Sequence, residues 1–188
     1  MPMQLILASA SPRRAELLTS SGFEFTVRPT DIDERYHLNE SPEDYVVRVA
    51  REKADALADE YRSTGVVLAA DTVVVARGEI LGKPADRLDA IRMLKLLSGA
   101  VHDVFTGVVV TSPDQELATA VRTRVSLLPL SMDEINWYID TGEPEGKAGA
   151  YAIQGHAARF IDRIEGSWSN VVGLPIATVY QMLKRVGA

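Results

Sequence analysis

The stretch from Gly65 to Ala76 constrains the fold most, because it is a nearly unbroken run of β-branched and small apolar residues. Such a run is typical of a strand buried in the middle of a sheet. Only Asp71-Thr72 interrupts it. An ionised carboxylate in apolar surroundings has to be paired, hydrogen-bonded, metal-bound or neutralised by a raised pKa. We therefore expect Asp71 where the strand reaches an active cleft, as a metal ligand or general base; a structural aspartate at a turn or bulge is the alternative.

Helix and strand patterns alternate along most of the chain, which predicts an α/β fold. The length of 188 residues suits one domain, or one domain of two lobes that share a sheet, and we take residues 1–188 as a single domain. Apart from 65–76, the patterns predict strands at 5–8, 23–27, 78–81, 102–111 and 116–128, and helices at 14–21, 41–61, 86–98, 131–141 and from 174 onward.

Three of the expected helices have clear local signals. Ser41-Pro42-Glu43-Asp44 combines an N-cap residue, a proline in the first turn and an acidic third position. Ser131 with Glu134 forms a capping box. The helix that begins near Asp86 is predicted from apolar residues that share one face. That predicted face consists of Leu88, Ile91, Leu94 and Leu97.

Composition excludes several classes of function. The apolar fraction of 46% and the charged fraction of 24% are ordinary for a globular protein. A net charge of -6 argues against binding to a nucleic-acid polymer, which requires a basic face. The lack of cysteine excludes disulfides, thiolate metal sites and cysteine nucleophiles, and it fits a reducing compartment. Without an apolar run of membrane length or a signal-like N-terminus, the sequence predicts a cytoplasmic protein with no membrane partner.

The first expected strand leads directly into Ser9-Ala10-Ser11-Pro12-Arg13-Arg14. Ser11 is an N-cap candidate and Pro12 occupies the first helical position, where proline is best tolerated. The N-terminus of a helix offers unpaired N–H donors and the positive end of the helix dipole, and Arg13 and Arg14 add forked donors suited to phosphate. This turn predicts an anion site, most simply for a nucleotide. The alternative is an ordinary surface helix with solvated arginines.

Three further charged residues are candidates for a phosphate or metal site. Glu34, in the acidic connector 31–34, could supply a second carboxylate to a hard cation, although acidic loops are usually solvated. Lys83 lies in the loop Gly82-Lys83-Pro84, where backbone and ammonium can approach a ligand together. Lys53 lies on a largely apolar helix side, so it either binds phosphate or extends its ammonium into water.

Common nucleotide-binding motifs are absent from the sequence. It contains neither a G-x-x-x-x-G-K-[ST] loop nor a G-x-G-x-x-G turn after a strand. The three histidines, at positions 37, 102 and 156, show no metal-ligand spacing, and we assign them no role. The phosphate-binding hypothesis therefore depends on the residues named above.

Taken together, the motifs of this chain resemble the Maf (septum-formation-inhibitor-like) family of nucleoside triphosphate pyrophosphatases over nearly its whole length. Their joint occurrence in this order is far more specific than any one of them. They are 7–14, Asp33-Glu34, Lys53-Ala54, 70–74, Gly82-Lys83-Pro84, Ser98-Gly99, His102, 106–108, Gly142-Glu143-Pro144, 146–155, Gly166-Ser167 and 170–175.

The resemblance implies hydrolysis of a nucleoside triphosphate to the monophosphate and pyrophosphate with a divalent cation, Mg²⁺ or Mn²⁺. It also implies a Maf/ITPase-like α/β fold with a mixed, twisted central sheet flanked by helices, two lobes with a nucleotide cleft between them, and a homodimer. In this family the residue matching Asp71 accepts the proton of the attacking water, and Asp71 and Glu34 hold the metal. The triphosphate would be bound by Ser9, Ser11, Arg14, Lys53 and Lys83.

Three positions indicate the branch of the family. Arg13, Thr72 and Gln154 match the branch that acts on dTTP and UTP, whereas the 7-methyl-GTP branch has tryptophan, glutamine and glutamate there. Gln154 offers an acceptor and a donor, which suits the O4 and N3–H edge of uracil or thymine. A tryptophan would instead stack on a cationic base, and Arg13 would not favour one.

Two other functions remain as alternatives to a dTTP/UTP pyrophosphatase. A non-catalytic, nucleotide-sensing regulator of cell division or septum formation would need phosphate donors but no general base, so Asp71 argues against it. Action on damaged purine nucleotides is disfavoured by Gln154.

Overall fold

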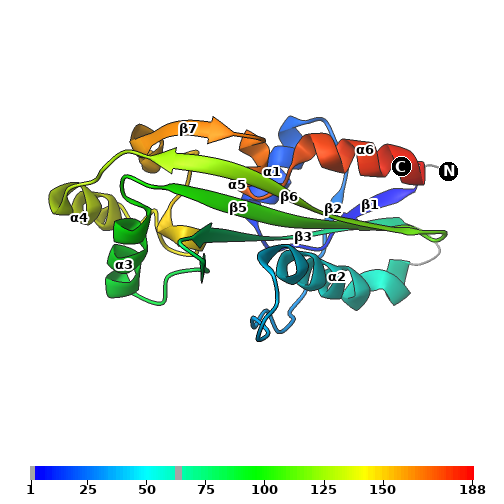
Figure 1. Cartoon of the computed structure of the whole chain (residues 1–188). Helices are drawn as coiled ribbons and strands as arrows, with labels where there is room; N and C mark the ends of the chain where they lie inside the picture. The colour runs from blue at the N-terminus through cyan, green and yellow to red at the C-terminus, as the bar shows by residue number, and fades with distance from the viewer. Residues whose placement is uncertain (1–2, 62–64) are drawn as a thin grey trace. The chain divides into compact units, whose positions relative to one another are not determined.

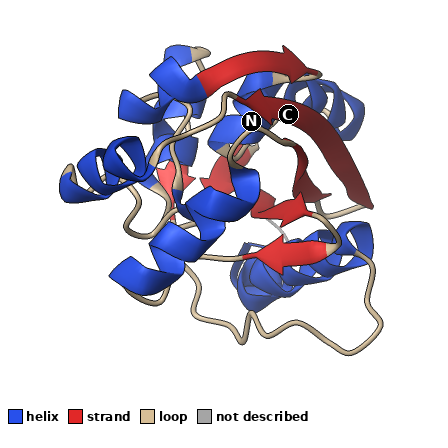
Figure 2. Ribbon diagram, turned by 60° about the vertical axis from the view of Figure 1, so that its left-hand side comes forward, coloured by secondary structure: helices blue, strands red, loops and turns tan. Residues whose placement is uncertain are grey.

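Helices and strands alternate in the computed structural model, which describes residues 3–61 and 65–188; Figure 2 colours the two kinds of element. The strands are β1 Gln4–Leu7, β2 Thr26–Val27, β3 Gly65–Ala76, β4 Glu79–Leu81, β5 Val101–Thr111, β6 Glu116–Leu127 and β7 Ile161–Glu165. The helices are α1 Pro12–Ser20, α2 Pro42–Tyr61, α3 Arg87–Leu97, α4 Met132–Asp140, α5 Trp168–Val172 and α6 Ile176–Val186, with 3₁₀ turns η1 Ala148–Ala150 and η2 His156–Phe160.

The described strands form one mixed sheet in the order β2-β1-β3-β5-β6-β7, with β4 paired to β3. β1 is parallel to both β2 and β3, whereas β4 is antiparallel to β3 and β7 is antiparallel to β6. The predicted mixed α/β sheet is therefore confirmed. β3 continues through Asp71 and Thr72 as one strand, so Asp71 does not mark a turn.

The chain divides into two compact units, and the division falls within β3, β5 and β6. Unit 1 contains Met1–Asp71, Thr106–Val121 and Gly173–Ala188; unit 2 contains Thr72–Phe105 and Arg122–Val172. Within the part of the chain that the structure describes, no helix has both the length and the apolar character needed to span a membrane.

In unit 1, α2 lies on the opposite side of β1 and β3 from α1 and α6 (Figure 1). Two small residues of α2, Ala50 and Ala54, are fully buried against alternate residues of the strands. Small side chains let the helix backbone come close to the sheet, and burial of this apolar surface stabilises the unit. The other members of this cluster are Ile6, Val67, Ala69 and Val109 of the strands and Ala8, which directly follows β1.

Both predicted capping patterns form hydrogen bonds. Ser41 Oγ accepts from the Asp44 N–H at 3.1 Å at the start of α2. Ser131 and Glu134 form the complete capping box of α4, in unit 2. These bonds satisfy backbone donors that the first turn of a helix leaves unpaired.

Several element predictions need correction. The strand expected at 23–27 is only Thr26–Val27, which pairs with Ile6 and Leu7. The predicted apolar face of α3 is wrong at Leu88, which is 75% exposed. The buried residues of this helix are Ala90, Met93, Leu94 and Leu97. The short helix α5 has no apolar repeat in the sequence and was missed.

Candidate active site

Lys53 lies at the centre of a charge cluster in unit 1. Its Nζ lies 2.8 Å from Asp71 Oδ1 and 2.7 Å from Glu34 Oε1. Lys53 and Asp71 are each 7% exposed, whereas the Glu34 side chain is 42% exposed. The sequence left open that Lys53 extends its ammonium into water. The structure shows instead that the ammonium pairs with the two carboxylates. The pairing also explains how β3 tolerates a carboxylate, since a buried charge requires a partner.

Three separate segments bring this cluster together. Asp71 ends the part of β3 that belongs to unit 1, Lys53 projects from α2, and Glu34 comes from the loop before α2. Lys53 is adjacent in sequence to Ala54, which packs against the sheet. The same close packing of α2 that buries the alanines thus places the Lys53 ammonium beside β3.

The turn after β1 forms a second polar group in unit 1. Arg14 is 8% exposed, and its Nη1 donates to Ser9 Oγ at 3.1 Å while its Nε donates to the Gly173 carbonyl at 2.8 Å. Burial lowers the pKa of Arg14, and the charges of Asp71 and Glu34 partly oppose this shift. The guanidinium therefore shares one electrostatic environment with the carboxylates of the Lys53 cluster.

The predicted N-cap role of Ser11 is only partly correct. Ser11 has the extended backbone of an N-cap and Pro12 follows at the first helical position, but the Ser11 side chain makes no capping hydrogen bond. The Ser11 N–H donates instead to Ser9 Oγ at 3.2 Å. Arg13 is half-buried, which lowers its pKa, while nearby Glu16 raises it. The Ser11 hydroxyl thus leaves the N-terminal N–H donors of α1 unused. An anion site at this helix end requires such available donors.

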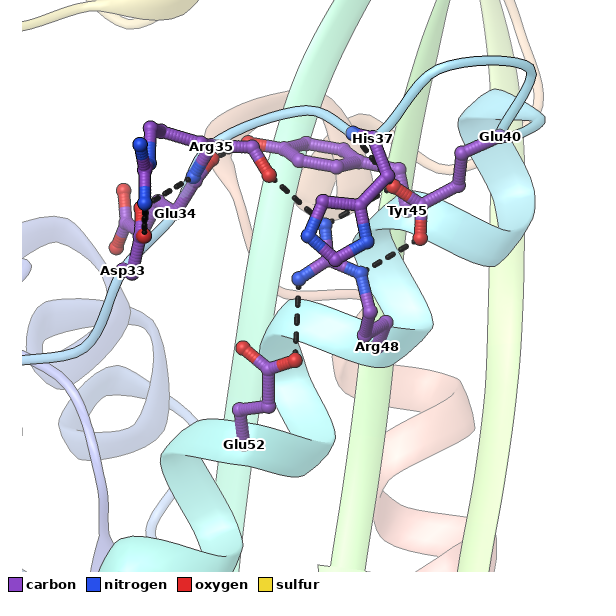
Figure 3. A network of polar contacts seen from close by, with 8 residues as sticks. All are labelled: Asp33, Glu34, Arg35, His37, Glu40, Tyr45, Arg48 and Glu52. Atoms are coloured by element: carbon purple, nitrogen blue, oxygen red, sulfur yellow. Dashed lines mark hydrogen bonds and ion pairs between the residues drawn. The ribbon is translucent and has the colours of Figure 1, made fainter.

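The loop that carries Glu34 is fixed to α2 by Arg48 (Figure 3). Arg48 donates to both oxygens of Glu40, at 2.6 and 2.9 Å, and to the Arg35 carbonyl at 3.0 Å. It also reaches Glu52, one turn further along α2, at 3.1 Å. The hydrogen bonds from Arg48 lower the pKa of Glu40, which keeps this carboxylate ionised.

Tyr45 binds the backbone of Glu34 itself (Figure 3). Its hydroxyl donates to the Glu34 backbone carbonyl at 2.8 Å. Burial, followed by the charges of Asp71 and Glu34, raises the pKa of Tyr45 to about 12, so the hydroxyl keeps its proton at neutral pH. Neither Tyr45 nor Arg48 was selected from the sequence. The Arg48 and Glu52 spacing of four residues indicates only a helix-surface pair, and no pattern indicates a bond to a loop carbonyl.

The remaining predicted residues belong to unit 2. Thr72 follows Asp71 directly in β3 and is half-buried. Lys83 is exposed, and the carbonyl of Gly82 beside it accepts from the Gly149 N–H at 3.0 Å. Gln154 is exposed in the turn before η2. The described contacts thus bring Ser9 together with Arg14, and Glu34 with Lys53 and Asp71, within unit 1; they do not unite these groups with Lys83 or Gln154.

Glu34 and Asp71 suit a hard divalent cation, because their oxygens already converge on one positive charge. Mg²⁺ commonly binds through one or two carboxylates and takes water and substrate phosphate oxygens as its other ligands. Across residues 3–61 and 65–188, no group of three or more His, Cys, Asp or Glu side chains is placed to hold a metal ion. The pair therefore fits a cation shared with a phosphate ligand better than one enclosed by protein.

Comparison with known proteins identifies the family of the chain. A Maf-like protein family model matches residues 4–186. The dTTP/UTP pyrophosphatase of Anaeromyxobacter dehalogenans strain 2CP-C is 53% identical over 100% of this chain and 96% of its own length. The protein of the same name from Geobacter sulfurreducens is 50% identical over 98% of this chain and 97% of its own length.

A solved structure supports the fold independently. The Staphylococcus aureus Ham1 protein aligns with 97% of this chain and 98% of its own, with a TM-score of 0.54 and 12% identity. At that identity the likeness concerns the fold alone. The family match and the identities to full-length relatives carry the conclusion: this chain belongs to the Maf-like protein family.

Proposed function

We propose that this chain is a nucleoside triphosphate pyrophosphatase that hydrolyses dTTP and UTP to the monophosphate and pyrophosphate. The observation that carries the proposal is the cluster in which Asp71 and Glu34 share the Lys53 ammonium. A carboxylate base, a cation and a second carboxylate are the groups required to activate water beside a phosphate. The names of the relatives support the same activity and substrates.

In the proposed reaction, Asp71 accepts a proton from the water that attacks the α-phosphorus, and pyrophosphate leaves. Lys53 holds the Asp71 carboxylate in position and neutralises charge on the phosphates. Ser9, Ser11, Arg14 and Lys83 supply donors to the triphosphate. Arg14 also positions Ser9, because its Nη1 donates to the Ser9 hydroxyl.

A divalent cation, Mg²⁺ or Mn²⁺, forms part of the proposal, with Glu34 and Asp71 as its protein ligands. When bound, it would polarise the phosphate oxygens and offset their negative charge. Tyr45 holds the backbone carbonyl of Glu34 and Arg48 holds that of the next residue, Arg35, so together they keep the Glu34 carboxylate near Asp71.

Arg13, Thr72 and Gln154 select the base in this proposal. The amide of Gln154 supplies one acceptor and one donor, as the edge of uracil or thymine requires. A homodimer and a cytoplasmic location complete the proposal; the location is supported by the absence of cysteine from all 188 residues.

Hydrolysis in ¹⁸O-labelled water tests the reaction directly. The protein is incubated with Mg²⁺ and each common nucleoside triphosphate. The products are then separated, and mass spectrometry measures the ¹⁸O content of each. We expect pyrophosphate and labelled UMP or dTMP, because attack at the α-phosphorus transfers the water oxygen to the monophosphate. Label in pyrophosphate would show attack at the β-phosphorus. Orthophosphate with a diphosphate, or no turnover, would contradict the proposed function.

Asp71→Asn tests the base. The amide cannot accept the proton, so we expect kcat to fall by about a thousandfold or more while nucleotide binding is retained. Turnover and equilibrium binding of a non-hydrolysable UTP analogue separate the two effects. Asp114→Asn, the same change in the exposed turn between β5 and β6, is the control. Full activity of Asp71→Asn would exclude Asp71 as the base.

A further inference from the structure

One carboxylate holds the turn that carries Gln154. Glu143, just after α4, accepts four hydrogen bonds within unit 2. Its Oε2 accepts from the backbone N–H of His156 at 2.7 Å and lies 2.9 Å from the Nδ1 of the same residue. Its Oε1 accepts from the Tyr138 hydroxyl at 2.8 Å and from the Ala157 N–H at 3.2 Å. The start of η2 is thereby fixed to the end of α4.

Tyr138 extends this anchor to the other side of Gln154. Its hydroxyl accepts from the Ala152 N–H at 3.1 Å while it donates to Glu143. The Gly155 N–H donates to the Ala152 carbonyl at 3.2 Å and closes the turn. The backbone before and after Gln154 therefore rests on one pair of side chains, Tyr138 and Glu143.

The turn also packs directly onto the carboxylate. A Cβ atom added at Gly155 would lie 2.0 Å from Glu143 Oε2, so only glycine permits this approach. Ile153 and Ala157 are 8% and 2% exposed, whereas the Gln154 side chain between them is exposed. Gln154 and His156 are the exposed polar side chains of this segment; the His156 ring lies against Glu143 at 2.9 Å, and the backbone on both sides of Gln154 is fixed.

The acceptor role requires Glu143 to be ionised. Burial alone would raise the pKa of Glu143, but the hydrogen bonds donated by His156, Tyr138 and Ala157 together bring it below its ordinary value. Burial and the nearby carboxylate raise the pKa of Tyr138, which keeps its hydroxyl a donor. Both groups therefore hold their present hydrogen-bonding roles at neutral pH.

We propose that Glu143, acting with Tyr138, is a positioning residue for base selection: it fixes the backbone of residues 152–157 so that the Gln154 amide meets the pyrimidine edge in one place. This inference rests on the proposed function, in which Gln154 reads the base. No spacing in the sequence indicates this role of Glu143, because the role depends on hydrogen bonds between its side chain and the backbone of the turn.

Glu143→Gln is the first test. The variant keeps the size of the side chain but has one acceptor oxygen in place of two, so at least one pair of donors faces an amide NH₂ group. We expect the ratio of kcat/KM for UTP over CTP to fall about tenfold, chiefly through a higher KM for UTP. Saturating UTP should restore most of kcat. Glu145→Gln, an exposed glutamate two residues away, should leave the ratio unchanged.

Hydrogen exchange of the peptide that covers residues 152–157 provides a readout that does not depend on activity. We expect faster exchange there in Glu143→Gln and no change in α1 or α2. Tyr138→Phe, which removes only one hydroxyl, provides a milder variant if Glu143→Gln does not fold, and it should show the same two effects more weakly.

The outcomes separate the two proposals. An unchanged UTP over CTP ratio in a folded variant of either residue would overturn the role of Glu143. Faster exchange without loss of discrimination would also overturn it, since the anchor would then be structural only. A wild-type protein without turnover would contradict the proposed function itself, and the exchange data would still show whether Glu143 holds the turn.

Discussion

At the scale of single residues, charge partners explain what the sequence could and could not reveal. Asp71 was identifiable because a carboxylate within an apolar strand needs a partner, and Lys53 is that partner. The two neighbouring arginines could not be distinguished in this way. The structure separates them: Arg14 is buried and bonded to Ser9 and Gly173, whereas Arg13 is half-buried.

Gln154→Glu tests base selection at a single residue. A carboxylate has no donor for the O4 atom of uracil, and its charge repels the triphosphate, so we expect kcat/KM for dTTP and UTP to fall at least about tenfold. Steady-state kinetics with both substrates measures the loss. Gln181→Glu makes the same change at an exposed position of α6 and should match the wild type. An unchanged substrate profile in Gln154→Glu would exclude this residue from base reading.

At the scale of elements, the long patterns were predictable and the short ones were not. The predicted strand over 65–76 is β3, and the helix from 41 to 61 differs from α2 only at its N-cap. In contrast β2 has two residues and α5 has five, which is too short for a period to be visible. Leu88 shows a further limit, because periodicity identifies an apolar face but not what packs against each of its turns.

α2 packs so closely on β5 that the contact requires a glycine at position 107. A Cβ added there would lie 2.1 Å from the Val46 carbonyl oxygen and 2.6 Å from the Val47 nitrogen, and backbone atoms cannot move aside as a flexible side chain can. We expect Gly107→Ala to lower the free energy of unfolding by about 3 kcal/mol. Urea titration followed by far-UV circular dichroism measures the change.

Gly82→Ala is the matched control for this packing. No atom lies within 4 Å of a Cβ added at Gly82, so its stability should stay within about 0.5 kcal/mol of the wild type. Equal midpoints for both variants would show that α2 and β5 can separate at little cost.

At the scale of the whole molecule, the site predictions divide between the two units. Seven of the ten predicted residues lie in unit 1, and Thr72, Lys83 and Gln154 lie in unit 2. The single domain over residues 1–188 stays a prediction. The match of the family model to residues 4–186 is consistent with it. Sequence patterns describe local structure, so they could not show that the division falls within three strands rather than in a linker.

Acid should weaken unit 2 through His102. This residue is 2% exposed, its Nε2 lies 2.8 Å from the Tyr151 hydroxyl, and its Nδ1 is buried without a hydrogen-bond partner in the described part of the chain. Burial lowers the pKa of His102 to about 4 from an ordinary value of 6.5. Between these values the unfolded chain binds more protons than the folded one, so stability falls as the pH is lowered.

His102→Gln should remove this part of the pH dependence, since glutamine does not titrate and can still bond to Tyr151. From pH 7.5 to 5.0 we expect the wild type to lose about 2 kcal/mol more than the variant. Urea titration followed by tryptophan fluorescence is suited to the measurement, because both tryptophans, Trp137 and Trp168, belong to unit 2. Equal losses in the two proteins would mean that His102 is protonated without disruption.

The order of the segments has a consequence for synthesis on the ribosome. The last residue of unit 2 is Val172, whereas unit 1 also needs Gly173, whose carbonyl binds Arg14, and α6. A growing chain therefore delivers all of unit 2 before it can complete unit 1. β1 is the first strand to leave the ribosome, yet it belongs to the unit that is finished last.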